Sequence, residues 1–245
     1  MPLSEALLKA FREFGEKPAR MWPLTRGKKN SFSESRLVEA MCSADTTSVT
    51  IKGTGLAQVH AHVDLRDDSR FPGVVPRRHV ELTVPVVAPD DERLRSFLDV
   101  VCSQYPVSLG GVFRAASPDH AGSEASLVGT NTIDPEVSRR ILFDARHRDD
   151  ASLKLRRLYP VTIIGPAIWA TLPPLPAVEP PLVVRELGDC KMVTAWPTLV
   201  DPHDPQFLLG TRELRRWLWP HTIGNPADDP HEVDIRLKWA ELLPW

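Results

Sequence analysis

The chain has 245 residues, including 24 prolines and 13 glycines, and a formal net charge of −2. Proline is near a tenth of the chain against a usual level of about 5%, which excludes a long regular helical bundle or solenoid and favours short elements joined by turns. The near-neutral charge offers no basic surface for nucleic acid. No apolar run approaches the roughly 20 residues of a membrane span. The start of the chain carries Glu5, Lys9 and Arg12, unlike a secretory signal peptide, so we expect a cytoplasmic protein.

The three cysteines, Cys42, Cys102 and Cys190, are odd in number and far apart, and no CxxC pair occurs. This spacing argues against a structural zinc site or a disulfide scaffold. Each cysteine lies in or beside an apolar stretch. We therefore expect all three to be buried as small apolar residues.

The first third of the chain predicts two helices followed by three strands. Apolar residues recur at helical spacing over residues 4–14, with Ser4 as the N-cap and Gly15 at the end. Residues 18–31 predict a basic loop, and Ser33 predicts the cap of a second helix. Apolar and polar residues then alternate as in half-buried strands. The second helix should bury Leu37, Val38, Met41 and Cys42, and the strands should cover residues 47–51, 58–65 and 80–86.

A third helix is predicted after Pro89, because Asp90, Asp91 and Glu92 place negative charge in its first turn, where the helix dipole favours it. A strand over residues 107–113 should follow. Residues 114–135 are small, polar and rich in glycine, and predict a long loop that would hold any internal boundary. The inward stripe of this third helix should be Leu94, Phe97, Leu98 and Val101.

The last part of the chain predicts a buried strand or turn over residues 159–164 and a short helix over 167–172, stopped by Pro173 and Pro174. A hairpin turning at Gly188-Asp189 follows, then a helix over residues 207–218. Hairpins mixed with helices predict an α+β fold with mostly antiparallel sheet and helices packed on one face. We expect a single domain over residues 1–245, and the pattern leaves open two similar halves.

The sharpest enzyme-like pattern is His60-Ala61-His62-Val63-Asp64. Alternate residues of a strand belong to one face, so His60, His62 and Asp64 could reach one metal ion. The string resembles the HxHxDH motif of metallo-β-lactamase-type hydrolases, but Leu65 replaces the final His. The simpler interpretation, which we favour, is a strand with one solvated face and no metal or other cofactor.

Two acidic clusters are candidates for binding a basic partner: Asp67-Asp68, and Asp228-Asp229 with Glu232 and Asp234, near Trp239. A third cluster is the helix start at residues 90–92. Such charges are usually solvated loops and helix starts, but an acidic patch can also speed and orient association. The seven tryptophans fit core packing, and any that is exposed would favour a protein-binding surface.

The succession of patterns between residues 75 and 220 resembles a known family. A strand, the helix from Asp90 to Tyr105 and the return strand Val107-Ser108-Leu109-Gly110-Gly111-Val112 come first. Leu158 to Pro166, Leu187 to Ala195 and the segment from Thr211 to Trp219 follow. This order resembles bacterial immunity proteins of polymorphic toxin systems, above all the immunity protein 52 family, and the related type VI secretion immunity-like proteins.

The resemblance implies a protein that is not an enzyme and that inhibits a cognate toxin by direct binding in the cytoplasm. For this family the expected toxin is a nuclease of the restriction-endonuclease type, so the partner would be a DNase. The inhibitor itself would bind neither nucleic acid nor membrane. The alternative that the residues leave open is a metal-dependent hydrolase using His60, His62 and Asp64.

Overall fold

The computed structural model describes residues 2–23, 30–43, 46, 48–54, 59–64, 79–85, 87–88, 90–114, 159–177, 182–194 and 198–199. The chain divides into two compact units. The N-terminal unit is Met1–Gln104 with Ser117–Ala125, and the C-terminal unit is Tyr105–Ala116 with Ser126–Trp245. The division follows directly after a helix that ends at Gln104. The sequence places the boundary in the loop over residues 114–135, which lies outside the described residues except for Arg114.

The fold is mixed α+β with antiparallel sheets, as the sequence predicts. In the described residues, the N-terminal unit holds a five-stranded sheet and the C-terminal unit a four-stranded sheet, with different strand orders. The elements of the N-terminal unit are α1 (Leu3–Glu13), β1 (Pro18–Pro23), β2 (Asn30–Ser31), α2 (Glu34–Cys42), β3 (Ser48–Gly53), β4 (His60–Asp64), β5 (His79–Thr83) and α3 (Glu92–Gln104). Those of the C-terminal unit are β6 (Leu109–Val112), β7 (Val161–Ile164), α6 (Pro166–Trp169), β8 (Val183–Leu187) and β9 (Cys190–Thr194).

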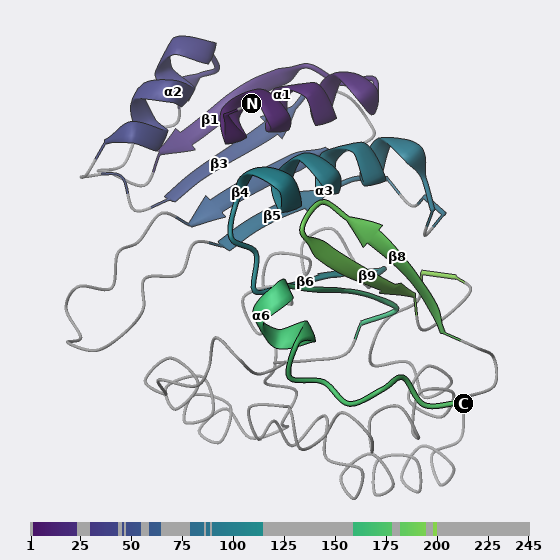
Figure 1. Cartoon of the computed structure of the whole chain (residues 1–245). Helices are drawn as coiled ribbons and strands as arrows, with labels where there is room; N and C mark the ends of the chain where they lie inside the picture. The colour runs from purple at the N-terminus through teal and green to yellow at the C-terminus, as the bar shows by residue number, and fades with distance from the viewer. Residues whose placement is uncertain are drawn as a thin grey trace, which may run out of the picture. The chain divides into compact units, whose positions relative to one another are not determined.

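The five-stranded sheet has the order β2-β1-β3-β4-β5, and α1 and α3 lie side by side across one of its faces (Figure 1). The register aligns Met21, Ile51 and Ala61 across three neighbouring strands, and all three are buried. Leu7 and Phe11 of α1 are buried as well. This helix-covered face therefore carries the core of the N-terminal unit, since burial of apolar area is the main force that favours folding.

Three sequence predictions for this unit are wrong. Ser4 lies inside α1 and is buried, and the N-cap is Pro2, which has no side chain to accept a hydrogen bond. Residues 18–31 contain the strands β1 and β2 in place of a continuous loop. α2 buries Leu37 and Ala40, whereas Val38 is 50% exposed.

Other local predictions for this unit are confirmed. The Ser33 hydroxyl accepts a hydrogen bond from the Arg36 backbone N–H at 3.3 Å, so Ser33 is the N-cap of α2. Gly15 ends α1 with φ +75°, in the left-handed region that favours glycine. In α3, Leu94 and Phe97 are buried, while Leu98 and Val101 are partly buried.

A buried carboxylate lies beside the end of β3 and Val59, which precedes β4. Glu16 is 5% exposed, and its Oε1 accepts a hydrogen bond from the Val59 backbone N–H at 3.5 Å. The Gly53 N–H donates to the Val59 carbonyl at 2.9 Å, which closes the two strand ends. Because glycine leaves room beside Gly53, the Glu16 carboxylate fits there: a Cβ at this position would lie 1.7 Å from Glu16 Oε2.

The four-stranded sheet has the order β6-β7-β9-β8, and every residue of β7 is buried. α6 contributes Ile168 to a buried cluster with Ile164 of β7 and Val193 of β9. The predicted hairpin is confirmed, since Leu187 pairs with Cys190 around Gly188, which has φ +54°. α6 ends at Trp169, three residues before the expected end at Leu172.

No helix among the described residues is both long enough and apolar enough to cross a membrane. The helix predicted at residues 207–218 lies outside the described residues.

Candidate functional site

The three residues that the sequence marks as metal ligands, His60, His62 and Asp64, lie at alternate positions of β4. This strand is an inner strand of the five-stranded sheet, between β3 and β5. Its register pairs His60 with Lys52 and Thr83, His62 with Thr50 and Glu81, and Asp64 with Ser48 and His79. The predicted group therefore lies opposite two residues of β5, His79 and Glu81, whose side chains are of types that bind metal ions.

The sequence analysis missed His79 and Glu81 as members of this group. Val80 and Leu82 alternate with them, which assigns the two residues to one face of β5. Only the pairing of β4 with β5 brings them opposite Asp64 and His62. Directly opposite residues of antiparallel strands have Cβ atoms about 4.5–5.5 Å apart, so this placement adds two further candidate ligands.

Among the described side chains, no group of three or more His, Cys, Asp or Glu residues is placed to hold a metal ion. The metal hypothesis for β4 and β5 rests on strand register.

Cys102 and Cys190 are buried, as predicted, but Cys42 is exposed at the end of α2. The prediction for Cys42 is wrong because α2 turns Leu37 and Ala40 inward.

Two of the predicted acidic clusters fall outside the described residues. These are the candidate partner-binding residues Asp67, Asp68, Asp228, Asp229, Glu232, Asp234 and Trp239. The third cluster is described and lies at the beginning of α3, where Asp90 and Glu92 are exposed and Asp91 is partly buried. The solvated helix start expected for this cluster is therefore confirmed for Asp90 and Glu92, and Asp91 has a structural role.

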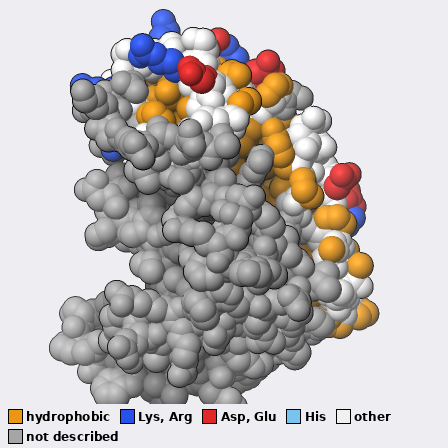
Figure 2. Space-filling model, turned by 90° about the vertical axis from the view of Figure 1, so that its left-hand side faces the viewer, with side chains coloured by type: hydrophobic (Ala, Val, Ile, Leu, Met, Phe, Trp, Pro, Cys, Tyr) orange, Lys and Arg blue, Asp and Glu red, His pale blue; other side chains and the backbone are white. Residues whose placement is uncertain are grey.

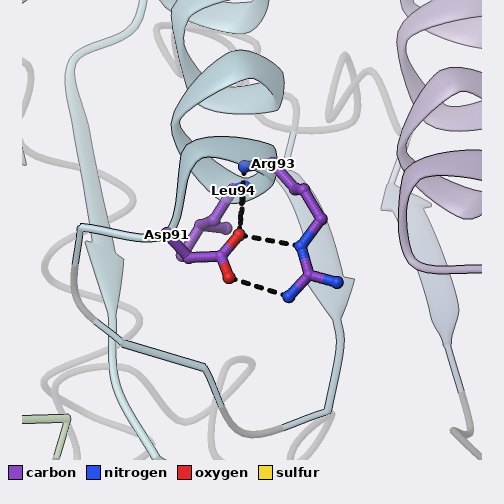
Figure 3. A network of polar contacts seen from close by, with 3 residues as sticks. All are labelled: Asp91, Arg93 and Leu94. Carbon is purple, nitrogen blue, oxygen red and sulfur yellow. Dashed lines mark hydrogen bonds and ion pairs between the residues drawn. The ribbon is translucent and has the colours of Figure 1, made fainter.

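Asp91 caps α3 and holds Arg93 (Figure 3). Its Oδ1 accepts hydrogen bonds from the backbone N–H groups of Arg93 and Leu94 at 3.0 and 3.4 Å. Arg93 Nε and one of its terminal nitrogens donate to the two carboxylate oxygens at 3.0 and 2.8 Å. The guanidinium group also lies 4.5 Å from the centre of the ring of Phe14, the residue that follows α1. The cluster thus connects the start of α3 with the end of α1.

The Asp91 carboxylate should make stability depend on pH. The hydrogen bond from the Arg93 side chain, followed by the backbone hydrogen bonds, lowers the pKa of Asp91 below its ordinary value of 3.8, although burial opposes the shift. A lowered folded-state pKa stabilises the fold above pH 3.8, and this contribution is lost as the pH falls through the folded-state pKa. Replacing Asp91 by Ala should cost about 0.5–2 kcal/mol at neutral pH.

The measurement is urea denaturation of the wild type and Asp91→Ala at pH 7 and pH 2.5. The difference between the two proteins should be largest at pH 7 and shrink at pH 2.5. Asp90→Ala is the matched control, since Asp90 is exposed and adjacent. Equal losses for both variants would contradict the capping role of Asp91.

Three large apolar side chains are strongly exposed among the described residues. Leu175 and Val183 are 42% and 44% exposed, and Val38 of α2 is the third strongly exposed large apolar residue among the described ones. Trp169 is partly buried against the cluster of Ile164, Ile168 and Val193, so it fits the core-packing interpretation.

Charged side chains of both signs are interspersed with apolar ones on the described surface in Figure 2. In that view the described residues form no continuous acidic field.

The chain was compared with models of protein families, with curated proteins and with solved structures, and no family model, curated protein or solved structure matches it.

Proposed function

We propose that this chain is an immunity protein that binds and neutralises a cognate antibacterial toxin, a nuclease of the restriction-endonuclease type. The proposal starts from the resemblance of residues 75–220 to the immunity protein 52 family. The structural observation that supports it is the exposure of two apolar side chains of the C-terminal unit. Leu175 and Val183 are two of the three strongly exposed large apolar residues in the described part of the chain. Exposed apolar side chains of this kind suit a protein-binding surface.

Direct binding to the toxin tests the proposal. A toxin encoded by the neighbouring gene is purified with an inactivated catalytic site and mixed with this protein. A stable complex is expected, and the protein should abolish DNA cleavage by the active toxin at stoichiometric amounts. Because such a toxin acts on DNA in the cytoplasm, the inhibitor is proposed to act there as well. Unchanged cleavage in the presence of excess protein would refute the function.

The acidic clusters make a separate prediction about how the toxin is recognised. A nuclease must hold phosphates, so its working surface is positive and would attract acidic side chains. Charges at an interface rim mainly raise the association rate, and salt screens them over about 10 Å at 0.1 M. The double variant Asp228→Lys/Asp229→Lys should therefore associate more slowly, with a weaker dependence on salt and with unchanged folding.

Stopped-flow association at several salt concentrations measures this effect. Asp67→Lys/Asp68→Lys is the matched variant, and the cluster that changes the salt slope is the one that faces the toxin. If both double variants associate like the wild type, acidic mimicry is the wrong mechanism. Inhibition would then depend on other surfaces of the protein.

The alternative function is a metal-dependent hydrolase, and the register of β4 and β5 favours it as the second candidate. It pairs His62 with Glu81 and Asp64 with His79, so residues of ligand type gather at neighbouring positions of one sheet. Metal analysis of protein purified without a His tag distinguishes the two functions. About one equivalent of zinc per chain would support the hydrolase. The immunity function predicts no metal, and predicts that His60→Ala/His62→Ala still neutralises the toxin.

A further inference from the structure

One row of residues that runs across the five-stranded sheet is rich in basic side chains. The register pairs Ser31 of β2 with Arg20 of β1, and Arg20 with Lys52 of β3. Lys52 pairs in turn with His60 of β4, and His60 with Thr83 of β5. No acidic residue occupies this row in the described strands. Directly paired residues of antiparallel strands share one face of the sheet, so Arg20 and Lys52 are neighbours on that face.

A side chain from outside the sheet joins the same row. Arg36 of α2 donates a hydrogen bond from Nη1 to the Ser31 hydroxyl at 3.5 Å. This contact brings its guanidinium group next to the residue that pairs with Arg20. Arg20, Ser31, Arg36 and Lys52 are all exposed. We call these four residues the basic row.

The stability of the sheet does not account for the basic row. Like charges directly opposite each other on neighbouring strands disfavour folding, and Arg20 lies opposite Lys52. Among the described residues, neither Arg20 nor Arg36 forms an ion pair. The Glu16 carboxylate lies beside Gly53, the neighbour of Lys52, but it is only 5% exposed. The two guanidinium groups are therefore accessible to an anion from solution.

The chemistry of the basic row fits a chain of phosphate groups. A guanidinium group donates two parallel hydrogen bonds to a phosphate, an ammonium group supplies a compact positive charge, and a hydroxyl donates one further hydrogen bond. Neighbouring strands are about 4.8 Å apart, so the row spans about 10 Å from β2 to β3. Its charges are arranged in a line across three strands. They match an anion whose charges also lie in a line.

We propose that the basic row binds the phosphate chain of an oligophosphate anion. This binding would be a property of the N-terminal unit in addition to the proposed toxin binding, and it does not depend on a toxin. The net charge of −2 does not oppose it. Salt screens exposed charges over about 10 Å at 0.1 M, so the groups close to the anion determine its affinity.

Calorimetric titration of the whole chain with sodium tripolyphosphate in metal-free buffer tests the site. One anion per chain should bind, and added salt should weaken the binding. Arg20→Ala and Arg36→Ala should each raise the Kd about 3- to 10-fold, because each removes a two-pronged contact. Arg20→Lys keeps the charge without the planar fork, so its Kd should lie between those of the wild type and Arg20→Ala.

Arg185→Ala is the matched control, because Arg185 is an exposed arginine on β8 of the other unit, and it should bind like the wild type. Since Arg20 is exposed and its removal relieves charge repulsion, Arg20→Ala should unfold at the temperature of the wild type or above it. Arg36→Ala, which changes a different element, provides an independent measurement of the same contact.

Titration with ATP distinguishes the two sources of a phosphate chain. An equal Kd for ATP and tripolyphosphate supports recognition of the chain alone, and a lower Kd for ATP supports a nucleotide as the ligand. Neither binding heat nor a rise in unfolding temperature at about 10 mM tripolyphosphate would overturn the inference. Equal weakening by Arg20→Ala and Arg185→Ala would do so as well. Tighter binding of a single-stranded oligonucleotide than of tripolyphosphate would also overturn it, because the row would then belong to a nucleic-acid surface.

Discussion

Replacing Phe97 by alanine should lower the free energy of unfolding by about 3–5 kcal/mol, the usual cost of removing a large core aromatic side chain. Phe97 is 6% exposed on α3, and Leu94 on the same helix is buried to the same extent. α3 lies beside α1, whose Phe11 is fully buried. The substitution would leave a cavity that neighbouring side chains fill only in part.

Urea denaturation followed by circular dichroism measures this loss. Arg95→Ala on the same helix is the matched control, because Arg95 is exposed, and it should change stability by less than about 0.5 kcal/mol. A loss below about 1 kcal/mol for Phe97→Ala would mean that this face of α3 does not pack in the core.

Replacing Gly165 by alanine should cost about 3 kcal/mol or more, because the new side chain would meet backbone atoms that cannot rotate away. A Cβ at Gly165 would lie 2.0 Å from the Val107 carbonyl oxygen and 2.9 Å from that of Ser108. The Gly165 N–H donates to the same Ser108 carbonyl at 2.9 Å, so the two segments are held at this distance. The clash would separate the start of β6 from the connection between β7 and α6.

Calorimetric unfolding of Gly165→Ala checks this expectation, and Gly15→Ala is the control. Nothing lies within 4 Å of a Cβ at Gly15, so only its φ of +75° opposes an alanine there. That backbone strain costs about 1–2 kcal/mol. If Gly165→Ala is the milder of the two variants, the close approach of these two segments does not occur in the protein.

The elements that the sequence determined by itself are those with local signals. The hairpin at Gly188, the cap of α2 at Ser33 and the end of α1 at Gly15 were all predicted correctly. In each case the deciding interaction joins residues close in the chain: a tight turn, a side chain bonded to the next helical turn, or a residue that tolerates positive φ. Strand β4 was also predictable from its own residues, because alternation of apolar and polar residues is visible in the sequence without knowledge of the partner strand.

Tertiary structure alone decided the features that depend on distant partners. Residues 18–31 look like a basic loop in the sequence, yet pairing with β3 makes residues 18–23 a strand and buries Met21. The inward face of α2 was misjudged, since neighbouring elements determine whether Val38 or Ala40 is covered. The placement of Glu81 opposite His62 likewise required the register of β4 and β5. Backbone hydrogen bonds between strands are nearly indifferent to side-chain identity, so the sequence specifies which residues favour a strand better than it specifies which strand each will face.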